Sequence, residues 1–137
     1  MAVTGMGTVL KFAPAGEESV VVGRLTSIGS IAENSEEIDV TTLDAPNGVR
    51  EFVQGAKDPG QVDVEGFFAP GDAGQAALIR AYRLGAVGQA EVAFADGTTA
   101  VFSAFVKRYS IGSAEVDGAV GFRAVLRLTG GVTLSGI

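Results

Sequence analysis

Apolar and polar residues alternate along much of this chain, which predicts that most of it forms β-strands. The clearest case is Gln61–Phe67, where Val62 and Val64 share one face, and the alternation returns in Ala119–Thr129. Alternation with period two marks a strand with one covered face and one face that meets solvent or a partner. Further strands are expected at Thr8–Ala13, Ser19–Ile28, Glu36–Thr42, Val87–Ala95 and Thr98–Tyr109.

Turn residues separate these strands and indicate how they connect. Asp96-Gly97 lies between two apolar runs and predicts a hairpin. Gly130-Gly131 is expected to end the last strand, which leaves residues 130–137 as a C-terminal tail. Residues 1–18 are a candidate N-terminal arm.

One segment carries the signals of a helix. Asp72 suits the N-cap, Gln75 follows three residues later as in a capping box, and Gly85 suits the C-terminal end. An apolar stripe at helical spacing lies between them. These signals predict a helix over about 72–84 that covers one sheet.

Strands on both sides of one helix, without alternating βαβ units, indicate an α+β fold that is mainly β. We expect an antiparallel β-sandwich or partly open barrel with one flanking α-helix. The 137 residues fit a single domain, 1–137. A compact domain of 13.9 kDa exposes about 6,700 Å².

The segment Leu43–Gly60 is long for a connection, because loops in compact domains usually span about 4–6 residues. It contains Val49, Phe52 and Val53, so it is not a purely polar linker. This composition favours a projecting arm, and a flexible insertion is the alternative.

The composition excludes several classes of chemistry. The chain has no Cys, no His and no Trp, so thiol nucleophiles, disulfides, Ser-His-Asp triads and His-ligated metals are absent. A formal net charge of -6 argues against phosphate-backbone binding as the main activity. No segment approaches the roughly 18 apolar residues of a membrane span, and no signal-peptide pattern is present. We expect a cytoplasmic soluble product without a membrane contact.

The remaining chemistry rests on carboxylates. A glycosidase needs two of them about 5–9.5 Å apart, but no spacing in the sequence singles out a pair. A calcium site is a second alternative, although the EF-hand pattern is missing. Its candidate oxygen ligands in the long segment are Asp39, Asp44, Asn47 and Asp58. The residues therefore predict no enzyme, and a small ligand- or calcium-binding barrel stays open.

Charge is distributed unevenly along the chain. The segment Glu33–Asp44 carries five acidic residues and no basic one. In Lys107–Arg127 basic residues predominate, and Arg123 and Arg127 share one face of a strand as a candidate basic interface. Opposite patches on one chain suit a head-to-tail contact between copies, although both can equally be solvated faces.

The middle of the chain resembles the tail tube proteins of long-tailed bacteriophages. The resemblance covers about Ser27 to Leu134 and rests on short motifs in the right order. They are Ile38-Asp39-Val40-Thr41-Thr42-Leu43-Asp44, then Gly48-Val49-Arg50-Glu51-Phe52-Val53-Gln54-Gly55-Ala56-Lys57-Asp58, then Gly66-Phe67-Phe68, Gln75-Ala76-Ala77-Leu78, Asp96-Gly97-Thr98 and Ser110-Ile111-Gly112. The same fold occurs in type VI secretion tubes and in gene transfer agents, so a tube of such a phage-derived particle is the alternative.

The resemblance implies a structural virion protein without catalytic activity and without a cofactor. It implies hexameric rings stacked head to tail, whose lumen conducts DNA during ejection without binding it specifically. The implied partners are further copies of the chain, the tail tip and tail terminator proteins, and the tape-measure protein. The implied location is the virion tail, assembled in the cytoplasm of the bacterial host.

The resemblance also assigns roles to particular residues. The long segment becomes an inter-ring loop, with contacts expected from Leu43, Asp44, Arg50, Glu51, Phe52, Val53, Lys57 and Asp58. The acidic balance suits a lumen through which DNA slides. The candidate lumen acids are Glu33, Glu36, Glu37 and Asp39.

Overall fold

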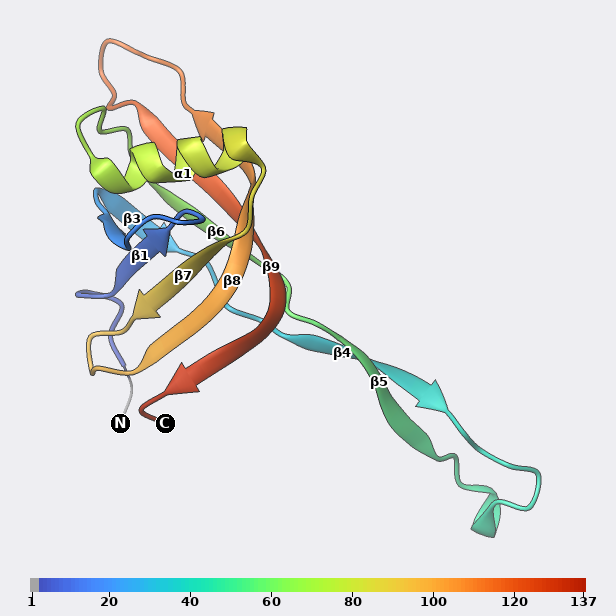
Figure 1. Cartoon of the computed structure of the whole chain (residues 1–137). Helices are drawn as coiled ribbons and strands as arrows, with labels where there is room; N and C mark the ends of the chain where they lie inside the picture. Colours follow the sequence, from blue (N-terminus) through green and yellow to red (C-terminus); the bar gives the residue numbers. More distant parts are fainter. Residues whose placement is uncertain (1–2) are drawn as a thin grey trace.

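The computed structural model describes residues 3–137, which form a small barrel and a long projecting hairpin (Figure 1). The described residues contain nine strands, one α-helix and a 3-10 turn at Pro46–Gly48. Their bounds are β1 (Val9–Ala13), β2 (Val20–Val22), β3 (Leu25–Ile28), β4 (Asn34–Asp39), β5 (Phe52–Asp58), β6 (Gln61–Phe67), α1 (Ala73–Leu84), β7 (Gly88–Ala93), β8 (Thr99–Ile111) and β9 (Gly121–Ser135). The predicted fold class, mainly β with one helix, is confirmed.

Seven strands form one antiparallel sheet in the order β2-β1-β7-β8-β9-β6-β3. The two edge strands, β2 and β3, are separated in sequence by only Gly23 and Arg24. Because so short a link cannot span an open sheet, the sheet curls until its edges meet and forms a nearly closed barrel. The prediction of one continuous strand over Ser19–Ile28 is therefore wrong. Arg24 has a left-handed φ of 62°, which breaks that strand.

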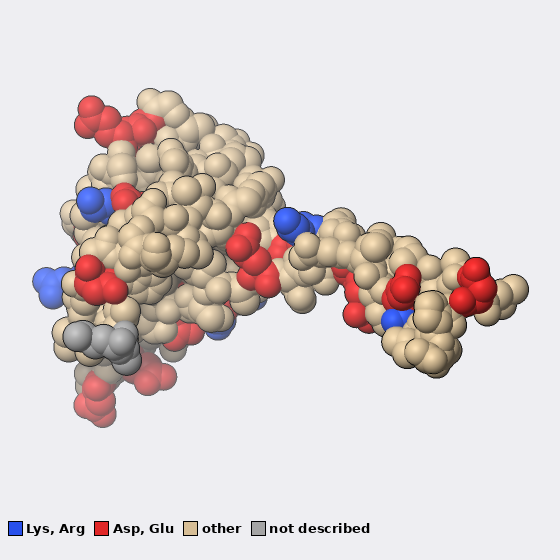
Figure 2. All heavy atoms as spheres, turned by 90° about the horizontal axis from the view of Figure 1, so that it is seen from below, with Lys and Arg blue, Asp and Glu red and all other residues tan. Residues whose placement is uncertain are grey.

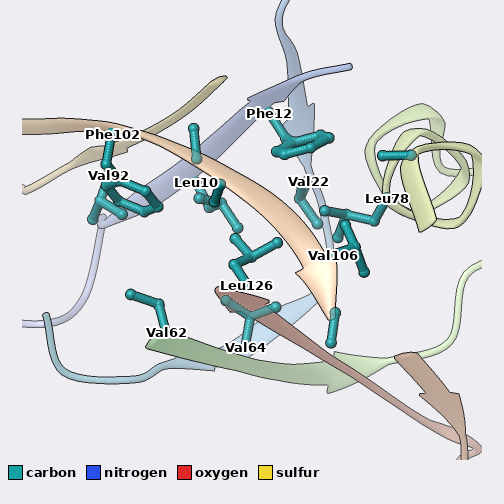
Figure 3. Close-up of a cluster of buried hydrophobic side chains, with 14 of the residues drawn as sticks. Leu10, Phe12, Val22, Val62, Val64, Leu78, Val92, Phe102, Val106 and Leu126 are labelled. Atoms are coloured by element: carbon teal, nitrogen blue, oxygen red, sulfur yellow. The ribbon is translucent and has the colours of Figure 1, made fainter. Parts of the chain in front are cut away.

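The barrel interior contains the apolar face of each alternating strand (Figure 3). Val62 and Val64 of β6 are 1% and 0% exposed, as their alternation predicted. The other fully buried large side chains come from β1, β7, β8, β9 and α1, namely Phe12, Phe102, Phe122, Leu10, Leu78, Leu126 and Val92. Burial of these side chains stabilises the barrel through the hydrophobic effect.

The N-terminus of α1 seals the seam between the two sheet edges. Asp72 caps the helix through Oδ2, which accepts hydrogen bonds from Gln75 N at 2.9 Å and Gly23 N at 3.0 Å. Gln75 is 1% exposed, and its Nε2 donates to the carbonyl oxygens of Gly23 (3.2 Å) and Phe67 (2.8 Å). Its Oε1 accepts from Ala69 N at 2.9 Å. The predicted helix and its N-cap are confirmed, but Gln75 holds the seam and does not complete a capping box.

Two predicted boundaries near the chain ends differ from the structure. The last strand continues through Gly130, at φ 82°, to Ser135, so the predicted C-terminal tail is largely strand. Near the start, β1 lies inside the barrel with Leu10 and Phe12 fully buried. The predicted N-terminal arm therefore cannot include Val9–Ala13, and its first two residues lie outside the described part of the chain.

The hairpin β4–β5 forms a separate two-stranded sheet that projects from the barrel (Figure 1). The first strand was expected at Glu36–Thr42 but is Asn34–Asp39, and the segment predicted as a loop contains strand β5. The molecule exposes 8713 Å². This is about 2,000 Å² more than a compact chain of its mass exposes, and the projecting hairpin accounts for such an excess.

Candidate assembly surface

We call residues 34–58, which comprise β4, the turn and β5, the arm. All of β4 is exposed, and in β5 only Gly55 is partly covered. An isolated two-stranded hairpin is marginally stable in water, because it has no third strand or helix to cover a face. The arm therefore has the features of a surface that another molecule covers.

The strand register divides the side chains of the arm between two faces. Ile38 pairs with Val53, and Asp39 pairs with Phe52, so the two pairs point to opposite sides. The backbone N of Val40 donates to Glu51 O, which places Val40 on the Ile38 side. We call the side with Ile38, Val40 and Val53 the apolar face. These three side chains are 48%, 41% and 49% exposed.

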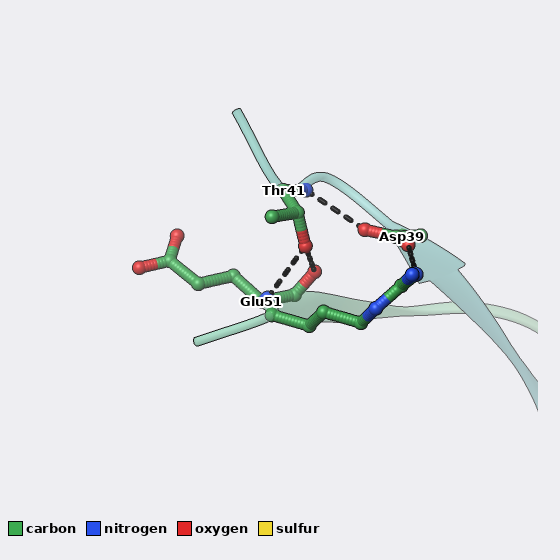
Figure 4. Close-up of polar contacts among 4 residues, drawn as sticks. Asp39, Thr41 and Glu51 are labelled. Atoms are coloured by element: carbon green, nitrogen blue, oxygen red, sulfur yellow. Dashed lines mark hydrogen bonds and ion pairs between the residues drawn. The ribbon is translucent and has the colours of Figure 1, made fainter. Parts of the chain in front are cut away.

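The opposite side, which we call the polar face, carries a local hydrogen-bond network (Figure 4). Asp39 accepts from Arg50 Nη1 and from Thr41 N, both at 2.9 Å. Thr41 Oγ1 accepts from Glu51 N at 2.8 Å and donates to Glu51 O at 3.3 Å. The hydrogen bonds from Thr41, together with that from Arg50, hold the pKa of Asp39 below its ordinary value. The network fixes the hairpin register beyond the end of β4.

The tip of the arm exposes two further apolar side chains. Leu43 is fully exposed, and Val49 is 62% exposed. Between them lies the 3-10 turn, in which Asn47 has a φ of 56°. Asp44 accepts a hydrogen bond from Thr42 Oγ1 at 2.6 Å, and this bond lowers its pKa. Leucine at a loop tip with no neighbour is costly in water, which favours a partner at this end as well.

An ion pair joins the arm to the barrel. Arg127 Nη2 of β9 lies 3.0 Å from Asp58 Oδ1, which also accepts from Gly60 N at 2.8 Å. The guanidinium of Arg127, and then the amide of Gly60, lower the pKa of Asp58. The pair is partly exposed, so it orients the arm more than it stabilises the fold.

The structure places both residues of the candidate basic interface in ion pairs within the chain. Arg123 Nη2 lies 2.9 Å from Asp63 Oδ2, and its Nε lies 3.5 Å from Glu65 Oε1. Arg127 pairs with Asp58. Both guanidinium groups stay partly exposed, and their contact with another subunit remains a prediction.

The candidate inter-ring residues lie from the tip to the base of one hairpin. Leu43 and Asp44 are at the tip, Arg50 and Glu51 precede β5, and Phe52, Val53, Lys57 and Asp58 belong to β5. The candidate lumen acids Glu36, Glu37 and Asp39 are exposed on β4, and Glu33 precedes it. Figure 2 shows carboxylates spread along the arm with few cations among them. The arm carries six acidic and two basic side chains, a net charge of -4.

The structure does not support the calcium alternative. Asp39, Asp44 and Asp58 each bond to a different neighbour along the arm. Among residues 3–137, no group of three or more potential acidic ligands could hold a metal ion. The proposed ligands in the long segment therefore do not converge.

A cavity of about 700 Å³ lies near the end of the barrel from which the arm departs. Its walls are apolar and hydroxyl side chains from β3, β7, β9 and the N-terminal segment. Among the lining residues that the structure describes, Glu33 is the one that carries a charge. A carboxylate pair for sugar hydrolysis is therefore not assembled there. In the described part of the chain no helix is long and apolar enough to cross a membrane.

A nearly closed barrel that exposes an amphipathic hairpin has the features of a subunit that works by assembly. The family model for the lambda phage tail tube protein matches residues 6–120. The chain therefore belongs to the lambda phage tail tube protein family and is a structural component of a tail tube, not an enzyme. The match begins at residue 6, whereas the sequence motifs were recognisable only from about Ser27.

Solved structures confirm the fold. The tail of an empty gene transfer agent particle is similar at 18% identity, covering 98% of this chain and 100% of that chain, with a TM-score of 0.80. The SPP1 tail tube is similar at 21% identity over 99% of this chain and 80% of that chain, with a TM-score of 0.73. A chain from the sheath-tube complex of the extracellular contractile injection system PVC is similar at 12% identity, covering 99% of this chain and 93% of that chain, with a TM-score of 0.75. A search of curated proteins gave no match.

Proposed function

We propose that copies of this chain form hexameric rings that stack head to tail, and that the arm of each subunit contacts a subunit of the adjacent ring. The observation that carries this proposal is the arm itself, a two-stranded sheet with both faces exposed. Six-fold symmetry is supported by the similar gene transfer agent tail, which is described with C6 symmetry. A heterologous contact, in which two different surfaces meet, produces this kind of extended assembly.

The net charge of -6 suits a tube through which DNA passes without being held. Because affinity for nucleic acid comes mainly from Lys and Arg at the phosphates, an acidic wall discourages adhesion. Glu33, Glu36, Glu37 and Asp39 remain the candidates for this wall. The proposal predicts that assembled tubes do not retain duplex DNA at low salt, whereas tubes of Glu37→Lys do so in a salt-dependent manner.

The proposed partners at the tube ends are a tail terminator, tail tip proteins and an internal tape-measure protein. Similar chains come from structures described as a tube-terminating cap and a baseplate of the anti-feeding prophage. Copurification with tail particles, followed by mass spectrometry, tests these partners and also tests whether the chain is located in the tail.

Assembly is tested with the purified chain. Light scattering and negative-stain microscopy at rising concentration should show rings and then tubes. Leu43→Asp should prevent stacking of rings and leave the melting temperature of the monomer unchanged, because the leucine contacts nothing in the monomer. A chain that stays monomeric at every concentration and is absent from tail particles would overturn the proposal.

A further inference from the structure

The arm is amphipathic: one face carries mainly apolar side chains, and the other carries mainly polar ones. Building on the stacking proposed above, we infer that the apolar face, formed by Ile38, Val40 and Val53, docks against another copy of this chain. The polar face of the same hairpin then points away from the contact. The inference therefore specifies the orientation of the arm on its partner.

The apolar face is a row of apolar side chains that lies between two glutamates. Glu51 is the cross-strand partner of Val40, and Glu36 lies beside Gly55 toward the base. Ile38 and Val53 are directly paired across the strands, and Val40 extends the row toward the tip. Gly55 continues the same face toward the base. A Cβ at Gly55 would lie 3.0 Å from Ile38 Cδ1, so the isoleucine side chain lies across the glycine. About half of each apolar side chain in this row is exposed, and an apolar row of this kind suits close packing against a second protein surface.

The polar face does not need a partner in the same way. Asp39, Thr41 and Arg50 bond within the arm, so their strongest hydrogen-bonding groups are already satisfied. Burying this network against another molecule would desolvate a charged pair without adding a bond. The polar face is thus suited to water, and Phe52 is its one large apolar side chain.

The partner is a second copy of this chain, for two reasons. The chain's own barrel cannot cover the apolar face, because the arm projects away from it (Figure 1). In a tail tube built from one subunit, the neighbouring surface of each protomer is provided by further copies of the same subunit. The contact is heterologous, since the arm carries a net charge of -4 and two arms would repel each other.

Two adjacent positions provide a matched pair of variants. Val53 and Gln54 follow each other in β5 and point to opposite faces, and both are exposed. Val53→Asp adds one charge to the apolar face, and Gln54→Asp adds the same charge to the polar face. We expect Val53→Asp to raise the concentration needed for tube formation at least tenfold, and Gln54→Asp to change it less than threefold. Both monomers should melt at the wild-type temperature.

A second readout reports the environment of each face directly. Because the chain has no cysteine, Val53→Cys and Gln54→Cys each create one labelling site for an environment-sensitive fluorophore. On assembly, the emission of a label at position 53 should shift to the blue, and the label should become less accessible to a soluble quencher. The emission of a label at position 54 should change little.

The outcomes separate the inference from the proposal on which it rests. Suppose that the wild type forms tubes and that Val53→Asp forms them equally well, or that Gln54→Asp is the variant that fails to form tubes. Either result overturns the inference about which face docks, but it does not overturn the proposal that the arm mediates stacking. A label at position 54 that becomes buried instead of one at position 53 has the same meaning. A wild-type chain that never assembles overturns both.

Discussion

Replacing Gln75 by Leu tests whether one buried amide holds the seam of the barrel. The change removes three hydrogen bonds and leaves the Gly23 and Phe67 carbonyl oxygens and the Ala69 N–H without their partner. Each buried polar group left unpaired costs about 1–3 kcal/mol, and the leucine recovers part of this through apolar burial. We therefore expect a loss of about 3–5 kcal/mol in the free energy of unfolding.

This loss is large compared with the total stability of about 5–15 kcal/mol that is typical of a domain. For a chain of 137 residues, 1 kcal/mol shifts the melting temperature by about 3.5 °C. The expected decrease is thus about 10–17 °C, measured by circular dichroism on dilute monomer and checked by urea unfolding. A loss below about 1 kcal/mol would refute the view that Gln75 closes the barrel.

Gln75→Glu is the informative control. It keeps the acceptor for Ala69 N but loses the donors, and at neutral pH it places a carboxylate beside two carbonyl oxygens. Burial and these oxygens raise the pKa of the glutamic acid in the folded state above its unfolded value. The variant should therefore gain stability as pH falls through that raised pKa, until acid destabilises the rest of the fold. A pH-independent loss in Gln75→Glu relative to wild type would contradict the hydrogen-bond explanation.

Three further predictions follow from local geometry. Gly74→Ala should destabilise the monomer by about 3 kcal/mol in urea unfolding, because the new Cβ would clash with the carbonyl oxygen of Val21. Gly71→Ala, with open space around the new Cβ, should be neutral. Because the pKa of Asp58 is lowered in the folded state, its contribution is present at neutral pH and is lost as pH falls below the ordinary value of 3.8. An NMR titration should then show the base of the arm loosening, and Arg127→Gln should show the same change at neutral pH. Calcium and a chelator should leave the melting temperature unchanged, since the described residues hold no cluster of ligands, and a rise with calcium would restore the binding-module alternative.

Several elements of the fold follow from the sequence because their signals are local. The helix could be predicted because Asp72 caps its first turn and Gly85, at φ 67°, ends it within the same short segment. The strand β6 and the part of β9 up to Leu128 could be predicted because every second residue is apolar and enters one core. The ordered motifs also identified the family, since they depend on the order of residues and not on their arrangement in space.

Other features were decided by contacts between distant segments. Gly130-Gly131 was expected to end β9, yet the strand continues because β8 pairs with it on both sides of the glycines. Val101 pairs with Thr133, and Ser103 pairs with Thr129, so the extra residues of β9 form a bulge between these pairs. A glycine with positive φ can occupy a bulge within a strand or the end of a strand. Only the pairing with the partner strand shows which of these two situations applies.

In the arm, too, some features follow from the sequence and others depend on the tertiary structure. The sequence determined that 43–60 is too long and too apolar for a simple loop, and it determined the negative charge. It could not show that Phe52–Asp58 pairs with β4, because the segment lacks clean alternation and the pairing partner lies across a long turn. It also could not show that Arg123 and Arg127 find carboxylates within the chain. Cross-strand register decides which side chains share a face, and only the tertiary structure sets that register.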